Sequence, residues 1–181
     1  MSAITKIEWA DRTWNCVRGC SIVSPGCVNC YAMKQAHRFS KQIANNKGGY
    51  RDGPFKGLTK LTKAGPQWTG VVRTIDDALL EPLSWRKPAR VFVNSMSDLF
   101  HEDVPDAFIA SVFATMRACD RHTFQILTKR HQRMQTLLSS AAFVHALEEG
   151  TEPGWPWPLP NVWLGISLED PPRAGAGIPR L

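Results

Sequence analysis

Strand-like and helix-like segments alternate along the second half of the chain, and this alternation constrains the fold most. Apolar, β-branched runs at 89–94, 123–127 and 161–168 are each typical of a buried strand. Between them, residues 105–119 and 131–147 carry apolar side chains at helical spacing, the second segment as one helix or two. Strand, helix, strand, helix, strand is the order of a parallel sheet with helical crossovers, so the sequence predicts an α/β fold.

The predicted sheet is small. With a short strand before the first cysteine, the chain has room for about four βα units, which is too few to close an eight-stranded barrel. We therefore expect a partial (β/α) barrel, truncated relative to a full one. The alternatives are a truncated gene product, a fragment, or a homo-oligomer in which a second copy supplies the missing strands. A single domain, 1–181, is expected, in three parts: a cysteine-rich loop and helix (1–45), a basic surface loop (46–73) and the βα units (74–181).

Two further helices are predicted outside the alternating segments. One follows the cysteines at about 29–40, and a short one spans 75–85 with Thr74 as its N-cap. Gly150 is expected to end the helical region before it, and a proline-rich connector, EPGWPWPLP, leads to the last strand.

Composition and hydropathy indicate a protein of the cytoplasm. No run of eighteen apolar residues is present, so no membrane span is expected. The first residues, MSAITKIEWADRTW, lack the apolar stretch of a secretory signal. A reducing compartment follows, in which clustered cysteines favour metal binding or redox chemistry over structural disulfides.

Positive charge is concentrated in the first half of the chain. Residues 1–90 hold 15 Lys and Arg against 6 Asp and Glu, whereas 91–181 hold 7 against 10. The excess is densest between Lys34 and Lys63, where the only acid is Asp52. This strip suits a nucleic acid or nucleotide partner. A solvated helix and loop with spare lysines is the alternative, because no aromatic stacking motif accompanies the charge.

Four of the five cysteines, Cys16, Cys20, Cys27 and Cys30, fall within fifteen residues in the pattern C-x3-C-x6-C-x2-C. Four thiolates satisfy a tetrahedral zinc ion, although six residues are a short connection between two zinc knuckles. Thiolates from one short loop are also the usual ligands of a [4Fe–4S] cluster, and three of them leave one iron open. A disulfide pair, a zinc ion and an iron–sulfur cluster all remain alternatives. The fifth cysteine, Cys119, is expected to be a buried small apolar residue.

Polar residues follow each of the three predicted strands. Asp98 lies after the first strand, Lys129 and Arg130 after the second, and Glu169 after the third. Carboxyl ends of parallel strands share one edge, so Asp98, Lys129 and Glu169 should converge there. Each has a structural alternative: a helix cap for Asp98, solvation for Lys129 and Arg130, and the start of a loop for Glu169. His101 is expected to be exposed or to cap a backbone group rather than to bind a ligand.

Four blocks of sequence, taken in order, resemble one family: TWNCVRGCSIVSPGCVNCYA, VFVNSMSDLFHEDVP, FQILTKRHQRM and NVWLGISLED. The family is a largely phage-borne radical S-adenosylmethionine (SAM) family of unknown function, distantly similar to spore photoproduct lyase. The resemblance covers nearly the whole chain, from Thr13 to about Leu181.

The resemblance divides the cysteines. The first block of that family resembles W-N-P-x-x-G-C-x6-C-x2-C-Y-A, which implies Cys20, Cys27 and Cys30 as ligands of a [4Fe–4S] cluster. Cys16 falls where the family commonly has proline, so it is either a spare thiol or a fourth ligand. The spacing is a stretched form of the familiar radical SAM pattern, C-x3-C-x2-C.

The resemblance also implies a reaction. SAM chelates the open iron through its amino and carboxylate groups, and an electron that a donor has passed to the cluster cleaves it to methionine and a 5′-deoxyadenosyl radical. The radical then abstracts hydrogen from a substrate, for which the basic strip favours a nucleic acid or nucleotide. The residues expected at cofactor and substrate are Tyr31, Asn94, Ser95, Asp98, Lys129 and Glu169. The alternatives are a non-catalytic, zinc-stapled module that binds nucleic acid, and an inactive truncated relative.

Overall fold

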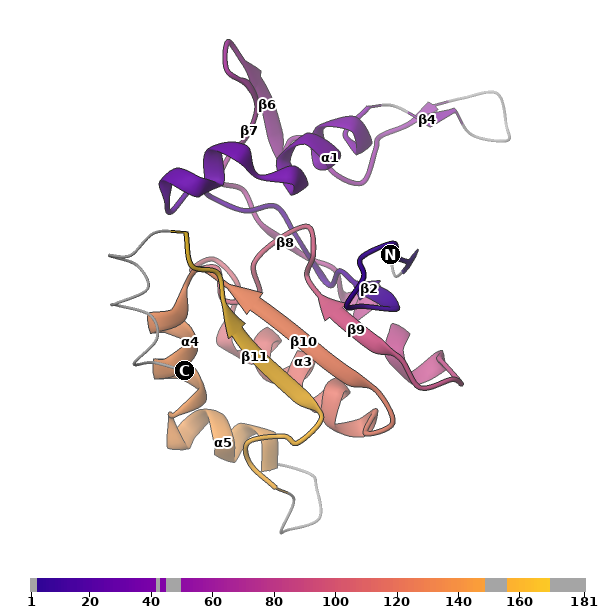
Figure 1. Ribbon diagram of the computed structural model, residues 1–181, viewed down its shortest axis with the longest axis vertical. Coiled ribbons are helices and arrows are strands. Elements are labelled where there is room, and N and C mark those ends of the chain that lie inside the picture. The colour runs from indigo at the N-terminus through magenta and orange to yellow at the C-terminus, as the bar shows by residue number, and fades with distance from the viewer. Residues whose placement is uncertain (1–2, 42, 45–49, 149–155, 170–181) are drawn as a thin grey trace.

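A computed structural model describes residues 3–41, 43–44, 50–148 and 156–169 (Figure 1). Its main sheet is open and has the strand order β1-β2-β9-β10-β11. The strands are β1 (Ala3–Ile4), β2 (Arg12–Trp14), β9 (Arg90–Val93), β10 (Thr123–Thr128) and β11 (Val162–Ile166). All neighbours except β1 and β2 pair in parallel, which confirms the predicted α/β fold with four parallel strands and no closed barrel.

Three helices cover one face of this sheet (Figure 1). They are α3 (Asp106–Ala118), α4 (His131–Leu138) and α5 (Ala141–Glu148). The strands alternate, so that Val91, Val93, Phe124 and Ile126 point into the core beneath the helices, where Cys119 is also buried. The segment predicted at 131–147 is thus two helices, and the predicted stop at Gly150 lies outside the described residues.

The opposite face of the sheet has little covering it. The turn between β1 and β2 folds back so that the ring centroids of Trp9 and Phe92 are 4.6 Å apart. Farther along, Leu127 and Trp163 are exposed, Trp163 by 60%. Parallel strands are ordinarily buried on both faces, so this exposure is unusual.

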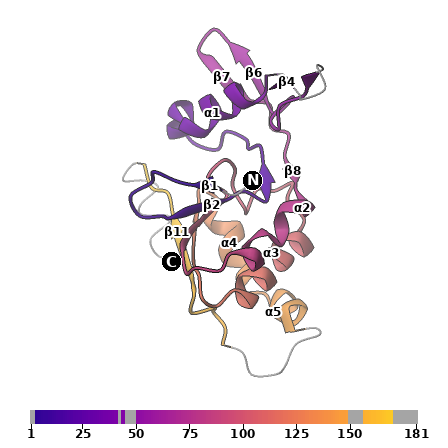
Figure 2. The same ribbon diagram turned by 90° about the vertical axis from the view of Figure 1, so that its right-hand side faces the viewer.

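A second layer lies beyond the carboxyl ends of the parallel strands, as both ribbon views show (Figures 1 and 2). It contains helix α1 and a hairpin and has its own small core, in which Met33, Leu58 and Trp68 are buried. The elements are η1 (Pro25–Asn29), α1 (Tyr31–Phe39), β4 (Ile43–Ala44), β5 (Tyr50–Arg51), β6 (Thr59–Thr62) and β7 (Gly65–Trp68).

Segment 46–73 is therefore not a single surface loop. Within its described part, β6 and β7 form an antiparallel hairpin that contacts α1. The prediction was wrong because Leu58 and Trp68 are too far apart in sequence to form a visible pattern, yet both pack on α1. The basic character is retained, since Lys60 and Lys63 are exposed on the hairpin.

The predicted helix at 75–85 is two short pieces, α2 (Asp76–Leu79) and η2 (Glu81–Ser84). Thr74 does not cap it. Thr74 instead belongs to β8 (Arg73–Thr74), which pairs with β3 (Val17–Arg18) just before the cysteine loop. Tertiary pairing of β8 with β3 has thus overridden the local capping signal. None of the described helices is long and apolar enough to cross a membrane.

Gly19 sets the path of the chain into the cysteine loop. Its φ is +91°, and a Cβ at this position would lie 2.1 Å from the carbonyl oxygen of Val71. Both the backbone conformation and the close approach exclude a side chain. The chain can therefore pass between β8 and the end of β9, where Gly19 bridges to Ser97, only because this residue is glycine.

We predict that Gly19→Ala lowers the free energy of unfolding by about 3 kcal/mol, from left-handed strain plus overpacking. Gly70→Ala is the matched control, because Gly70 has φ +89° but a Cβ there would have no neighbouring atom within 4 Å. It should lose only about 1–2 kcal/mol through strain. Urea denaturation followed by circular dichroism measures both, and equal losses would show that the approach to Val71 costs nothing.

Candidate functional site

A cavity of about 650 Å³ lies between the main sheet and the α1 layer, at the carboxyl ends of the strands. This volume is within the range of small-molecule sites, roughly 300–1,000 Å³. Its walls combine the cysteine loop, the start of α1 and the polar residues that follow β9 and β10. The cavity thus lies at the carboxyl edge of the parallel sheet, where the sequence predicts the functional residues.

The structure separates the four clustered cysteines into three and one. Cys20, Cys27 and Cys30 all line the cavity. Cys16 does not: it is completely buried in the core, and its thiol donates to Asn94 Oδ1 at 3.6 Å. Burial raises the pKa of the Cys16 thiol to about 12, so it stays neutral.

The cavity thiols have different surroundings. Burial raises the pKa of Cys20 to about 11, although the Arg130 guanidinium, 3.7 Å from its sulfur, opposes the shift. For Cys27, burial also disfavours the thiolate, but hydrogen bonds from Ser24 and nearby backbone outweigh it and the pKa is lowered. Among the described residues, no three His, Cys, Asp or Glu side chains are gathered closely enough to hold a metal ion. The three thiols therefore share a cavity without converging on one point.

Asp98 is the centre of a buried hydrogen-bond network. Its Oδ1 accepts from Thr128 Oγ1 at 2.7 Å and from the Phe100 amide at 3.0 Å. Its Oδ2 accepts from the Lys129 amide at 3.2 Å and from Arg130 at 3.1 Å. All these donors are satisfied by one carboxylate that is only 6% exposed, so Asp98 ties the end of β9 to the end of β10.

Arg130 extends this network into the cysteine loop. Besides Asp98, its guanidinium donates to Glu102 at 2.8 Å, to Ser21 Oγ at 2.7 Å and to the sulfur of Cys20. Burial opposes the charge, but the carboxylate of Asp98 and the other neighbours outweigh it and raise the pKa of Arg130. The alternative of a solvated arginine is wrong. Arg130 is buried and directly contacts Cys20, a candidate ligand of a metal cluster.

The predicted convergence of Asp98, Lys129 and Glu169 on one edge is confirmed. Besides the bond from its amide to Asp98, Lys129 forms an ion pair with Glu169 through Nζ. Glu169 Oε2 also accepts from the Gly26 amide at 2.9 Å, and a Cβ on Gly26 would collide with that carboxylate. Glu169, three residues beyond the end of β11, thereby anchors the cysteine loop at Gly26, whereas Arg130 contacts it at Ser21.

The residues expected to touch a cofactor, Tyr31, Asn94 and Ser95, all line the cavity. Asn94 has φ +57°, a conformation that non-glycine residues adopt uncommonly. Its Oδ1 accepts from Cys16 and from the Val17 amide, whereas its buried Nδ2 has no partner among the described residues. Tyr31 donates its hydroxyl to the Ser95 carbonyl at 2.8 Å, joining α1 to the end of β9.

The surroundings of His101 and Arg130 were foreseen only in part from sequence. His101 caps a backbone group, one of its two predicted alternatives, because its Nδ1 accepts from the Asp103 amide at 3.1 Å. It is buried rather than exposed, and Nε2 is left to donate to Ser21 Oγ at 2.8 Å. The hydroxyl oxygen of Ser21 therefore accepts hydrogen bonds from both His101 and Arg130. The signal available in the sequence was proximity to strand ends, since Arg130 directly follows Lys129 and His101 lies three residues beyond Asp98.

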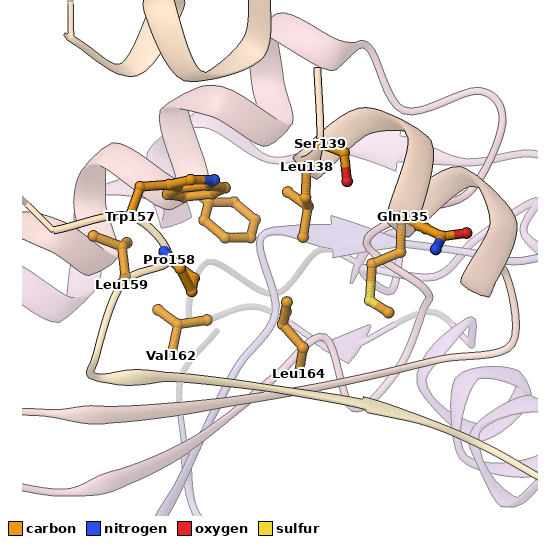
Figure 3. A pocket seen from close by; sticks show the side chains of 10 residues that line it. Gln135, Leu138, Ser139, Trp157, Pro158, Leu159, Val162 and Leu164 are labelled. Atoms are coloured by element: carbon orange, nitrogen blue, oxygen red, sulfur yellow. The ribbon is translucent and has the colours of Figure 1, made fainter. Parts of the chain in front are cut away.

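A separate apolar cavity of about 310 Å³ lies on the helix-covered side of the sheet (Figure 3). Leu138, Trp157 and Leu164 are among its walls, and no titratable side chain lines it. Its polar lining side chains are the neutral Gln135 and Ser139. The cysteine-lined cavity, by contrast, carries thiol, carboxylate, lysine and arginine side chains.

Comparison with protein families gives one match, which spans residues 4–181 and is described as "Protein of unknown function (DUF5131)". The chain belongs to this family. No curated protein and no solved structure matches it. Membership of DUF5131 carries no description of activity, so the resemblance to radical SAM proteins and to spore photoproduct lyase stays a prediction.

For this DUF5131 protein we predict that Asp98→Asn lowers the free energy of unfolding by about 3 kcal/mol, because an amide in place of the carboxylate leaves buried donors of Arg130 and Lys129 unpaired. Asp11→Asn is the matched control. It removes an ion pair with Arg90 that is about half exposed and screened by solvent, so its loss should be clearly smaller. Thermal and urea unfolding measure both, and similar losses would contradict a structural role for the Asp98 network.

Proposed function

We propose that this chain is an iron–sulfur protein of the radical SAM type, in which Cys20, Cys27 and Cys30 hold a [4Fe–4S] cluster. One observation carries the proposal: these three thiols line a single cavity at the carboxyl edge of a parallel sheet, while Cys16 is buried outside it. Three ligands are the number that leaves one iron open to a small molecule.

A bound cluster would supply the electron that cleaves SAM to methionine and a 5′-deoxyadenosyl radical. The chain's own residues would place and protect the reactants. Thiolate ligands are required. The positive charge of Arg130 beside Cys20 favours that form, although burial outweighs it and raises the pKa of Cys20 to about 11. Because the three thiols do not converge, binding of a cluster would require them to move closer together.

The remaining cavity groups suit SAM and a substrate in different ways. Asn94 Nδ2 is a buried donor without an acceptor among the described residues, which suits a carboxylate such as that of an amino acid. Asp98 accepts four hydrogen bonds, so we propose that it positions Arg130 and the strand ends rather than exchanging protons. Lys129 and Glu169 neutralise each other and hold the cysteine loop, with Glu169 also facing the Gly26 amide.

Two partners follow from the proposal. The reaction consumes one electron for each SAM, so an electron donor must dock near the cysteine loop, where Ile22, Val23 and Val28 are exposed. A nucleic acid or nucleotide is the proposed substrate, because Lys34, Lys60 and other basic side chains are exposed in the layer above the cavity.

Anaerobic reconstitution with iron and sulfide tests the function. We predict about four irons and four sulfides per chain, with brown absorbance, and formation of 5′-deoxyadenosine from SAM after reduction with dithionite. Cys20→Ala, Cys27→Ala and Cys30→Ala should each lose most of the iron. Cys16→Ala is the matched control and should retain it, with a stability loss of about 1 kcal/mol from the missing buried thiol contact.

Circular dichroism spectra establish that each variant is folded before its iron is measured. A colourless protein without iron would overturn the proposal. So would a protein that holds about one zinc ion and binds it more weakly when Cys16 is replaced. The second result would instead support a zinc-stapled module.

A further inference from the structure

The open face of the main sheet carries another cavity, of about 320 Å³, between two tryptophans. Trp9, Gln125 and Trp163 line it, with Leu127 at the side nearer the cysteines. Trp9 and Leu127 also line the cysteine-lined cavity, so the two hollows are adjacent. We call this second hollow the tryptophan cleft.

The sheet register explains how the tryptophan cleft arises. Phe92, Gln125 and Trp163 are direct neighbours on β9, β10 and β11. Neighbouring strands are about 4.8 Å apart, so the backbones of Phe92 and Trp163 are separated by about 10 Å. Trp9 packs on Phe92 at one side, Trp163 stands at the other, and Gln125 lies between them on the floor.

Two features of the tryptophan cleft are costly in a free protein. Trp163 is 60% exposed in β11, the parallel strand at the edge of the sheet, although parallel strands are usually covered on both faces. Gln125 Oε1 is buried without a hydrogen-bond partner among the described residues, whereas most buried polar atoms have one. A ligand with a flat apolar surface would cover Trp163, and its hydrogen-bonding edge would give Gln125 Oε1 a partner once this amide turns toward the cleft.

We propose that the tryptophan cleft binds an unstacked base of a single-stranded nucleic acid. Every base has a π-face that stacks on an aromatic side chain. The amide of Gln125 can present an acceptor or a donor by turning about its last torsion, which matches the edge of a base. Helix α1 and the β6–β7 hairpin lie in the layer beyond the same ends of the strands (Figure 1), and both carry exposed basic side chains.

The tryptophan cleft lies next to the cavity that contains the three candidate cluster ligands. Because Trp9 and Leu127 belong to both hollows, a base in the tryptophan cleft would lie directly beside the cysteine-lined cavity. The cleft would then hold the substrate next to the cofactors, a consequence that rests on the proposed function. Binding of the base itself depends only on Trp9, Gln125 and Trp163.

Fluorescence anisotropy of short fluorescein-labelled oligonucleotides tests the proposal, with an oligothymidine as the DNA probe and an oligouridine as the RNA probe. The full chain is used as purified, without iron, sulfide or SAM. Trp163→Ala should weaken binding about tenfold, the effect of losing one stacked base. Trp163→Phe should restore most of the affinity. Leu83→Ala removes an exposed apolar side chain elsewhere and should leave binding unchanged. The two oligonucleotides distinguish DNA from RNA.

A second measurement identifies the site directly. An oligonucleotide with one 4-thiothymidine should crosslink on irradiation to the β10 or β11 peptide that contains Gln125 or Trp163. No binding at low salt, equal affinity of Trp163→Ala and wild type, or crosslinks confined to the basic layer would each overturn the proposal. A dimer that dissociates on Trp163→Ala with oligonucleotide affinity unchanged would also overturn it, and would assign this face to a second copy of the chain. Because no cluster is assembled, these outcomes are separate from the test of the proposed function.

Discussion

The buried ion pair between Asp98 and Arg130 is the interaction on which the rest of the site depends. It joins the ends of two adjacent parallel strands, at the point where a sheet leaves backbone groups without strand partners. Two buried charges are costly to remove from water unless hydrogen bonds satisfy them fully. Here Asp98 accepts four hydrogen bonds and Arg130 donates onward to Glu102, Ser21 and Cys20.

This network makes the cysteine loop part of the sheet edge rather than an independent loop. Arg130 anchors the loop at Ser21, Glu169 anchors it at Gly26, and the side-chain oxygen of Asn94 accepts from the Val17 amide just before the loop. Cys20, Cys27 and Cys30 are thereby held around one hollow, while Cys16 remains in the core. The face of the sheet that α3, α4 and α5 do not cover stays open, and Trp163 is exposed there in the tryptophan cleft.

Much of the fold was predictable, because periodicity and strand ends are local signals. The strands at 89–94, 123–127 and 161–168 and the convergence of Asp98, Lys129 and Glu169 follow from alternation and the geometry of parallel sheets. The hairpin within 46–73 and the burial of Arg130 and His101 did not follow, since each depends on contacts between residues far apart in sequence. The separation of Cys16 from the other thiols came from the family resemblance, and spacing alone left it open.

The proposed function requires three thiolates that hold a cluster with one open iron. Electron paramagnetic resonance of the reconstituted, dithionite-reduced protein, recorded with and without SAM, measures whether that iron is open. We expect a [4Fe–4S]⁺ signal whose g-values shift when SAM is added, and the same shift in Cys16→Ala. A signal that SAM leaves unchanged, or one that disappears when Cys16 is replaced, would show a site closed by a fourth ligand and would rule out an open iron.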